Sequence, residues 1–169
     1  MTRTSPAPLQ ILVLGIGNTL LSDEGVGIHA VERLRRHPAR LPDVTLLDGG
    51  TLSFSLLPDV EEADALIVVD AARLSLPPGT VRRFSGPRMD RLVRAGIRTA
   101  HEVGLKELLD LARLDGRLPR YRALIAVEPC TLDWGTTLSP PVFASLDRVC
   151  SMIRATTARW QSVSGVCAA

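Results

Sequence analysis

The chain has 169 residues, of which 46% are hydrophobic, 22% are charged and 4% are aromatic, and its formal net charge is +2. These values fit a single globular domain, and a nearly balanced charge with few aromatic side chains argues against nucleic-acid binding. The cysteines are far apart and form no CxxC pair, so their spacing predicts neither a disulfide framework nor a zinc ribbon. We expect free, mostly buried thiols at Cys130, Cys150 and Cys167.

Both ends of the chain are predicted to be flexible tails. Residues 1–9 contain two prolines, and residues 161–169 follow the last predicted helix, which leaves a single α/β domain over residues 10–160. The apolar stretch near the N-terminus is interrupted by Gly15 and Gly17 and runs into Asp23, which is not the pattern of a signal peptide. No run approaches the roughly 18 apolar residues of a membrane span, and we expect a soluble cytoplasmic protein.

The first predicted elements are a strand, an acidic loop and a helix. The apolar run over residues 10–16 is typical of a buried strand, and it is followed by a glycine-rich turn. A helical pattern then begins at Gly25 and cannot continue through Pro38. Because Ser22 and Asp23 stand just before this helix, one of them is predicted to cap it.

Strands and helices alternate along the rest of the chain. Strands are expected at residues 44–47, 65–69 and 122–127, and an additional strand at 80–84 suits an antiparallel edge. Helices are expected at 52–57, from 105 to a stop at 115–116, and from 140 to about 160, whereas 85–99 is predicted to be a loop with a helical turn or two and 130–139 a long loop. This alternation predicts a three-layer α/β/α fold with a central, mostly parallel, twisted sheet of about five strands.

Acidic residues and one histidine stand where predicted strands end or helices begin. Because ligands bind beyond the carboxyl ends of parallel strands, these side chains are expected to converge on one edge of the sheet. Two carboxylates and an imidazole there can hold a divalent metal or act as acid and base. Each residue also has a structural explanation, such as capping a turn or a helix N-terminus. The candidates are Glu24, Asp48, Asp70, His101 and Glu128.

Other chemistries have weaker support in the sequence. A dinucleotide fingerprint would need a third glycine where Leu20 stands, and no P-loop motif is present. Neither a GxSxG elbow nor a cysteine-histidine signature appears, which disfavours covalent nucleophilic catalysis. The two remaining histidines, His29 and His37, are expected to be structural or exposed.

Five segments together resemble the nickel-iron hydrogenase maturation endopeptidases in order and spacing. They are GIGNTLLSDEGVG (15–27), LLDGGT (46–51), LIVVDA (66–71), HEVGL (101–105) and the stretch from Gly135 to Leu138-Ser139-Pro140. The resemblance extends over essentially residues 10–155. It implies a cytoplasmic protease that removes a short C-terminal extension from a hydrogenase large-subunit precursor after nickel has been inserted.

The resemblance also assigns roles to individual residues. Family members engage metal through two carboxylates and a histidine, which correspond here to Glu24, Asp70 and His101, and these three would be both metal ligands and catalytic groups. The turn Asp48-Gly49-Gly50-Thr51 matches the family's glycine-rich loop, which implies a substrate-binding role near the cleaved bond. The long loop that contains Trp134 would help to set which hydrogenase is recognised.

The expected cofactor is nickel that arrives with the precursor, although an oxygen, oxygen and nitrogen ligand set also accepts other divalent metals such as zinc. A water polarised by the metal or by a carboxylate would attack the peptide bond. The precursor is the expected partner, and we expect a monomer that binds neither nucleic acid nor membrane. The alternatives are a non-catalytic, nickel-checking chaperone for the precursor, and a small-molecule hydrolase or nucleotide binder on the same scaffold.

Overall fold

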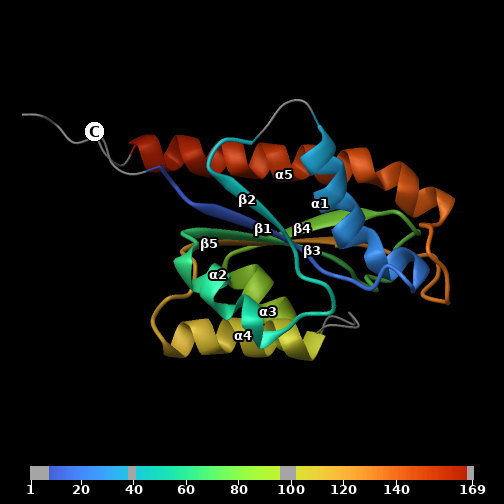
Figure 1. Ribbon diagram of the computed structural model, residues 1–169, viewed down its shortest axis with the longest axis horizontal. Helices are drawn as coiled ribbons and strands as arrows, with labels where there is room; N and C mark the ends of the chain where they lie inside the picture. Colours follow the sequence, from blue (N-terminus) through green and yellow to red (C-terminus); the bar gives the residue numbers. More distant parts are fainter. Residues whose placement is uncertain (1–7, 38–40, 96–101, 167–169) are drawn as a thin grey trace, which may run out of the picture.

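The computed structural model describes residues 8–37, 41–95 and 102–166 (Figure 1). Its middle layer is a five-stranded sheet with the strand order β2-β1-β3-β5-β4. The strands are β1 (Ile11–Gly15), β2 (Val44–Asp48), β3 (Ala65–Ala71), β4 (Val81–Ser85) and β5 (Tyr121–Val127). All neighbouring pairs are parallel except β4 and β5, so the predicted antiparallel edge strand is confirmed.

Helices cover both faces of this sheet, which confirms the predicted three layers. The helices α1 and α5 lie on one face, and α2, α3 and α4 lie on the other (Figure 1). Two short 3-10 helices, η1 and η2, precede α1 and α2. The bounds are η1 (Ser22–Gly25), α1 (Val26–Arg36), η2 (Phe54–Leu56), α2 (Leu57–Glu62), α3 (Pro87–Ala95), α4 (Glu102–Leu114) and α5 (Pro140–Val166).

The central strand β3 shows why the sequence forms this sheet. All seven of its residues are buried, as is typical of a parallel strand covered on both faces. Because side chains alternate along a strand, Ile67 and Val69 join the core under α1 and α5, while Leu66 and Val68 join the core over α2, α3 and α4. The apolar run at 65–69 thus supplies both hydrophobic cores.

Three expectations about the elements need correction. Residues 87–95 form the nine-residue helix α3 and not mainly a loop, because Met89 and Val93 lie one turn apart and are buried against the core. The last helix continues beyond Trp160 to Val166. The N-cap of α1 is Gly25, so neither Ser22 nor Asp23 caps this helix.

The cysteines only partly match the expectation of buried thiols. Cys150 is a residue of α5 and is buried in the core between this helix and the sheet, whereas Cys130 is exposed at the start of the loop that follows β5. Both thiols are free, as expected. Among the helices of the described residues, none is long and apolar enough to cross a membrane.

Candidate active site

The candidate site lies at the carboxyl rim, which we define as the edge of the sheet where the parallel strands β1, β2, β3 and β5 end. The register places Gly15 of β1 between Asp48 of β2 and Val69 of β3. Beyond it, the Ile16 amide donates to the Val69 carbonyl at 2.9 Å. The Gly17 amide then donates to the carbonyl of Gly50 at 2.8 Å. The segment that follows β1 is therefore joined to β3 and to the loop that follows β2.

Glu24 lies in η1, directly above the end of β1, and is only 5% exposed. Gly17 has a φ of 148°, and a Cβ at this position would collide with the carbonyl oxygen of Glu24. Only glycine permits this backbone conformation together with such a close approach. The glycine-rich turn after β1 therefore holds the backbone of Glu24 against the rim and leaves no room for a side chain between them.

Asp70 is the penultimate residue of β3 and is 1% exposed. The start of α1 packs tightly on this strand end, because a Cβ on Gly27 would collide with the Val69 and Ile16 carbonyl oxygens. The helix η1, which carries Glu24, also contacts β3. Two buried carboxylates, from segments 46 positions apart by subtraction of their numbers, thus stand on adjoining parts of one rim.

His101 lies outside the described residues. The helix α4 begins at the next residue, Glu102, and a Cβ on Gly104 would come within 3.3 Å of the Leu52 Cβ. The first turn of α4 therefore packs against the loop that follows β2. Within residues 8–37, 41–95 and 102–166, no group of three histidine, cysteine or acidic residues is arranged to hold a metal. The proposed trio includes His101, so its metal site stays a prediction.

The glycine-rich loop after β2 is built around Asp48. The exposed Asp48 accepts a hydrogen bond at Oδ1 from the Gly50 amide (2.8 Å), and Gly50 has a φ of 51°. The Gly49 amide donates to the Gly15 carbonyl at 2.9 Å, which ties the loop to β1. A Cβ on Gly50 would meet no atom within 4 Å. The Asp48 carboxylate therefore shapes a turn, and the space above Gly50 is open.

Asp23 anchors a loop beside the site, although its sequence position predicted a helix cap. Its side chain is completely buried and accepts four hydrogen bonds from the loop at residues 130–139. The donors are the amides of Cys130 (2.8 Å), Thr131 (3.1 Å) and Ser139 (2.6 Å) and the Ser139 hydroxyl (2.7 Å). Because these partners are 107 to 116 positions away, no local pattern identifies them.

Glu128, another acidic residue predicted for the rim, has a structural role. It is buried at the end of β5, and its Oε2 accepts hydrogen bonds from the amides of Leu74 (2.6 Å) and Leu76 (3.2 Å). These amides belong to the loop that follows β3. The Glu128 carboxylate therefore fixes that loop, in agreement with the structural explanation that the sequence left open.

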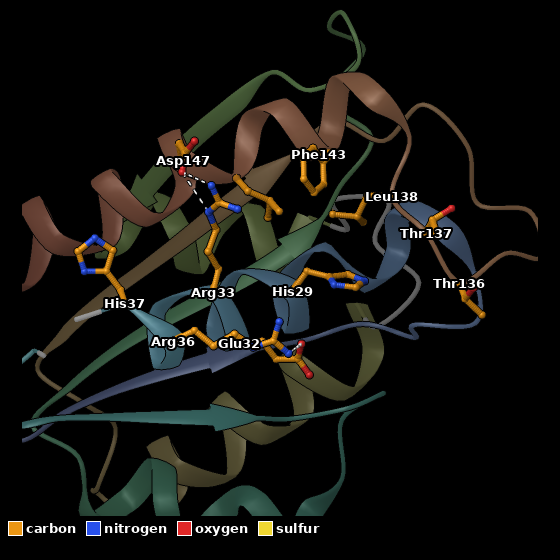
Figure 2. Close-up of a pocket in the computed structure, with 11 residues that line it drawn as sticks. His29, Glu32, Arg33, Arg36, His37, Thr136, Thr137, Leu138, Phe143 and Asp147 are labelled. Carbon is orange, nitrogen blue, oxygen red and sulfur yellow. Dashed lines mark hydrogen bonds and ion pairs between the residues drawn. The ribbon is translucent and has the colours of Figure 1, made fainter. Parts of the chain in front are cut away.

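A groove of about 760 Å³ lies between α1 and α5 (Figure 2). Neither Glu24 nor Asp70 lines it. Figure 2 shows Arg33 of α1 reaching Asp147 of α5, an ion pair of 2.6 Å. His29 and His37 both line the groove, and His29 Nε2 is buried with no hydrogen-bond partner among the described residues. The charges in this groove largely compensate one another, so it does not indicate the sign of a ligand.

Comparisons with known proteins agree with this architecture. The model of a hydrogenase maturation protease family matches residues 28–156. The chain is 44% identical over 134 residues to the hydrogenase expression/formation protein HupD of Thiocapsa roseopersicina, and 41% identical over 155 residues to HupD of Bradyrhizobium diazoefficiens. These alignments cover 79% and 89% of this chain, and the chain spans 61% and 81% of the two relatives.

Solved structures show the same fold. The hydrogenase maturating endopeptidase HybD of E. coli matches with a TM-score of 0.83 at 32% identity, over 89% of this chain and 93% of that one. The maturation protease HybD of Thermococcus kodakarensis matches with a TM-score of 0.76 at 29% identity, over 88% of this chain and 99% of that one. Each match thus covers almost nine tenths of this chain.

Proposed function

This chain belongs to the hydrogenase maturation protease family, and we propose that it removes the C-terminal extension of a nickel-iron hydrogenase large-subunit precursor. Endopeptidase processing of the large subunit is the function of this family. We propose further that the enzyme acts in the cytoplasm, as a monomer, once the precursor has received nickel.

The observation that carries the proposal is the pair of buried carboxylates at the carboxyl rim. Glu24 is 5% exposed and Asp70 is 1% exposed, and they belong to adjoining segments. Two carboxylates in such surroundings strongly favour a nearby cation, because burial weakens the hydration of each negative charge. A site of this kind suits the recognition of a metal ion that a substrate brings with it.

In this proposal nickel is part of the substrate. Glu24 and Asp70 would each offer an oxygen ligand and His101 a nitrogen ligand to the ion held by the precursor. Oxygen and nitrogen donors suit a borderline divalent ion such as nickel, and they also accept zinc. A precursor without its metal would lack these contacts, so the enzyme would distinguish loaded from unloaded substrate.

The same carboxylates supply the base that hydrolysis needs. A rim carboxylate accepts a proton from the attacking water, whose oxygen forms a bond to the carbon of the scissile amide. The carbon–nitrogen bond then breaks, and the proton passes to the leaving amine. The open space above Gly50 allows an extended peptide to approach the backbone of residues 48–51, which supports a substrate-binding role for this loop.

The test compares two preparations of the full-length precursor, one loaded with nickel and one without it. Each is incubated with the purified chain, and its intact mass is measured. We expect the nickel-loaded precursor to lose its C-terminal extension and the nickel-free precursor to keep it. A stable complex in which the loaded precursor keeps its full mass would overturn the proposal in favour of the chaperone. Tight nucleotide binding in calorimetry, without cleavage, would instead favour the nucleotide-binding alternative.

A further inference from the structure

Two large apolar side chains are exposed at the carboxyl rim, next to the candidate catalytic carboxylate. Leu20 is 52% exposed, and Trp134, in the loop between β5 and α5, is 82% exposed. The backbones of the two loops pair directly, because the Gly135 amide donates to the Leu20 carbonyl at 3.0 Å. Leu21 and Gly135 also form an isolated parallel bridge. The two side chains therefore belong to neighbouring loops of one surface.

The loop that presents Trp134 is firmly anchored on both sides of this residue. On one side, the Asp133 carbonyl accepts a hydrogen bond from the Ser22 hydroxyl at 2.9 Å. On the other, the Gly135 carbonyl accepts one from the Ser22 amide at 2.8 Å. The buried Asp23 carboxylate holds both ends of the loop through Cys130 and Ser139. A side chain on such a loop loses little conformational freedom when it binds a partner.

The anchoring residues also connect this surface to Glu24. Leu20 precedes Glu24 by four positions, and the Glu24 amide donates to the Leu21 carbonyl at 3.1 Å. Ser22 and Asp23, which hold the Trp134 loop, lie in the same 3-10 helix as Glu24. Leu20 and Trp134 therefore stand on segments that are bonded directly to the segment that carries Glu24.

We infer that Leu20 and Trp134 form a docking surface for an apolar segment of the large-subunit precursor, beside the segment that reaches Glu24. This inference rests on the proposed function. Exposed aromatic residues that become buried on binding contribute a large share of the affinity of protein interfaces. The surface acts by positioning the precursor and selecting it, and it contributes no group to the chemical step.

The groove of Figure 2 is a less suitable docking surface. It begins where the Trp134 loop continues into Thr136, Thr137 and Leu138. Its charged residues pair with one another, as in Arg33 with Asp147 and Arg36 with Glu32. These charged groups already have partners within the protein, whereas Leu20 and Trp134 expose apolar surface that a partner can bury.

The test measures the kinetics of precursor processing for Leu20→Ala, Trp134→Ala and the double variant of the full-length chain. The substrate is purified, nickel-loaded large-subunit precursor with its C-terminal extension. We expect KM for Trp134→Ala to rise by about tenfold or more while kcat stays within about twofold, since only binding contacts are lost. Trp134→Phe keeps an aromatic ring and is expected to restore most of the affinity.

Leu114→Ala is the matched control, because Leu114 is also 82% exposed but lies at the far end of α4. This end is about 18 Å along the helix from the first turn, which packs against Leu52. Unchanged KM for both single variants and the double variant, with unaltered thermal unfolding, would overturn the docking surface and leave the proposed function standing. A wild-type chain that does not cleave the precursor would overturn both.

Discussion

Asp23 and Glu24 are adjacent in the sequence, yet their carboxylates have different surroundings. Asp23 is completely buried and accepts four hydrogen bonds from the loop at 130–139, so its carboxylate is bonded within the protein. Glu24 is the neighbouring residue on the rim, and the proposed function gives it a role toward the metal and the substrate. One short acidic segment thus provides both an anchor for the Trp134 loop and a candidate catalytic group.

Replacement of Asp23 is expected to be strongly destabilising. In Asp23→Ala, three buried amides and one hydroxyl lose a charged acceptor, which should lower the free energy of unfolding by about 3 kcal/mol or more. Urea denaturation measures this change. The control is Asp147→Ala, which removes an exposed ion pair with Arg33 and should cost less than about 1 kcal/mol. Equal losses in the two variants would contradict the anchoring role of Asp23.

The two described thiols should differ in reactivity. Burial raises the pKa of the Cys150 thiol, which lowers its thiolate fraction, and it also restricts the access of reagents, whereas Cys130 is exposed. In a Cys167→Ser background at pH 8, we expect a maleimide to modify Cys130 at least about tenfold faster than Cys150. Mass spectrometry of digested samples measures both rates, and equal rates would show that Cys150 is not protected.

The elements that the sequence predicts best are those whose own residues form a clear apolar pattern. The fully buried strand β3 is an example. The helix α3 was predicted only in part, because its sequence is polar and its two buried residues, Met89 and Val93, contact a core formed by distant segments. The end of α5 beyond Trp160 has a different cause, because residues 161–164 are only partly buried and Val163 among them is 43% exposed, so no apolar stripe marks this part of the helix. Tertiary contacts thus decided α3, whereas the last residues of α5 continue a helix that is already formed.

The close contact between α1 and the rim can be tested by replacing Gly27 with alanine. Helix propensity predicts that this change raises the free energy of unfolding, whereas the close packing predicts that it lowers it. Alanine normally stabilises a helix by up to about 1 kcal/mol over glycine, but a Cβ on Gly27 would collide with backbone atoms of Ile16 and Val69. We expect Gly27→Ala to lower the free energy of unfolding by about 3 kcal/mol. The control Gly116→Ala meets no atom within 4 Å and should lose only about 1 kcal/mol from its φ of 70°. Thermal unfolding of both variants measures these losses. A Gly27→Ala variant that is more stable than the wild type would contradict the close contact.

The helices α3 and α4 are linked by charges that affect stability in acid. Burial acts to raise the pKa of Asp110, but a hydrogen bond from Lys106 and the charges of Arg113 and Arg94 lower it overall. A carboxylate with a lowered pKa stabilises the fold above its unfolded-state pKa of about 4, and this contribution is lost as the pH falls through the folded-state value.

Asp110→Asn should therefore be less stable than the wild type at pH 7 by less than about 1 kcal/mol, since solvent screens these partly exposed pairs. The difference should shrink as the pH falls below about 4. Denaturation at a series of pH values measures it. A stability difference that grows towards acid pH would contradict a lowered pKa of Asp110.

At the scale of the whole molecule, the rim was predictable because it follows from topology. Parallel strands end at a common edge, so Glu24 and Asp70 could be assigned to it from strand-end positions alone. The same reasoning could not separate Glu128, whose carboxylate fixes the loop after β3, from residues that face a substrate. It also could not show that Trp134 is exposed on an anchored loop, because the anchoring contacts join segments more than 100 positions apart.

The whole molecule thus combines a sheet whose central strands are buried with a rim on which residues from the first half of the chain meet a loop from the second half. The rim carries the two buried carboxylates, the glycine-rich loop and the exposed Leu20 and Trp134. This arrangement suits the proposed cleavage of a precursor whose scissile segment reaches the rim. The proposed function depends above all on metal binding and catalysis by Glu24, Asp70 and His101.

The most direct test of that claim is the intact mass of nickel-loaded large-subunit precursor after incubation with each of three variants. We predict that Glu24→Gln, Asp70→Asn and His101→Gln keep the fold, as judged by circular dichroism, and slow the loss of the C-terminal extension by about 100-fold or more. The exposed Asp147→Asn serves as the control and should process at the wild-type rate. Normal processing by all three rim variants would contradict the claim.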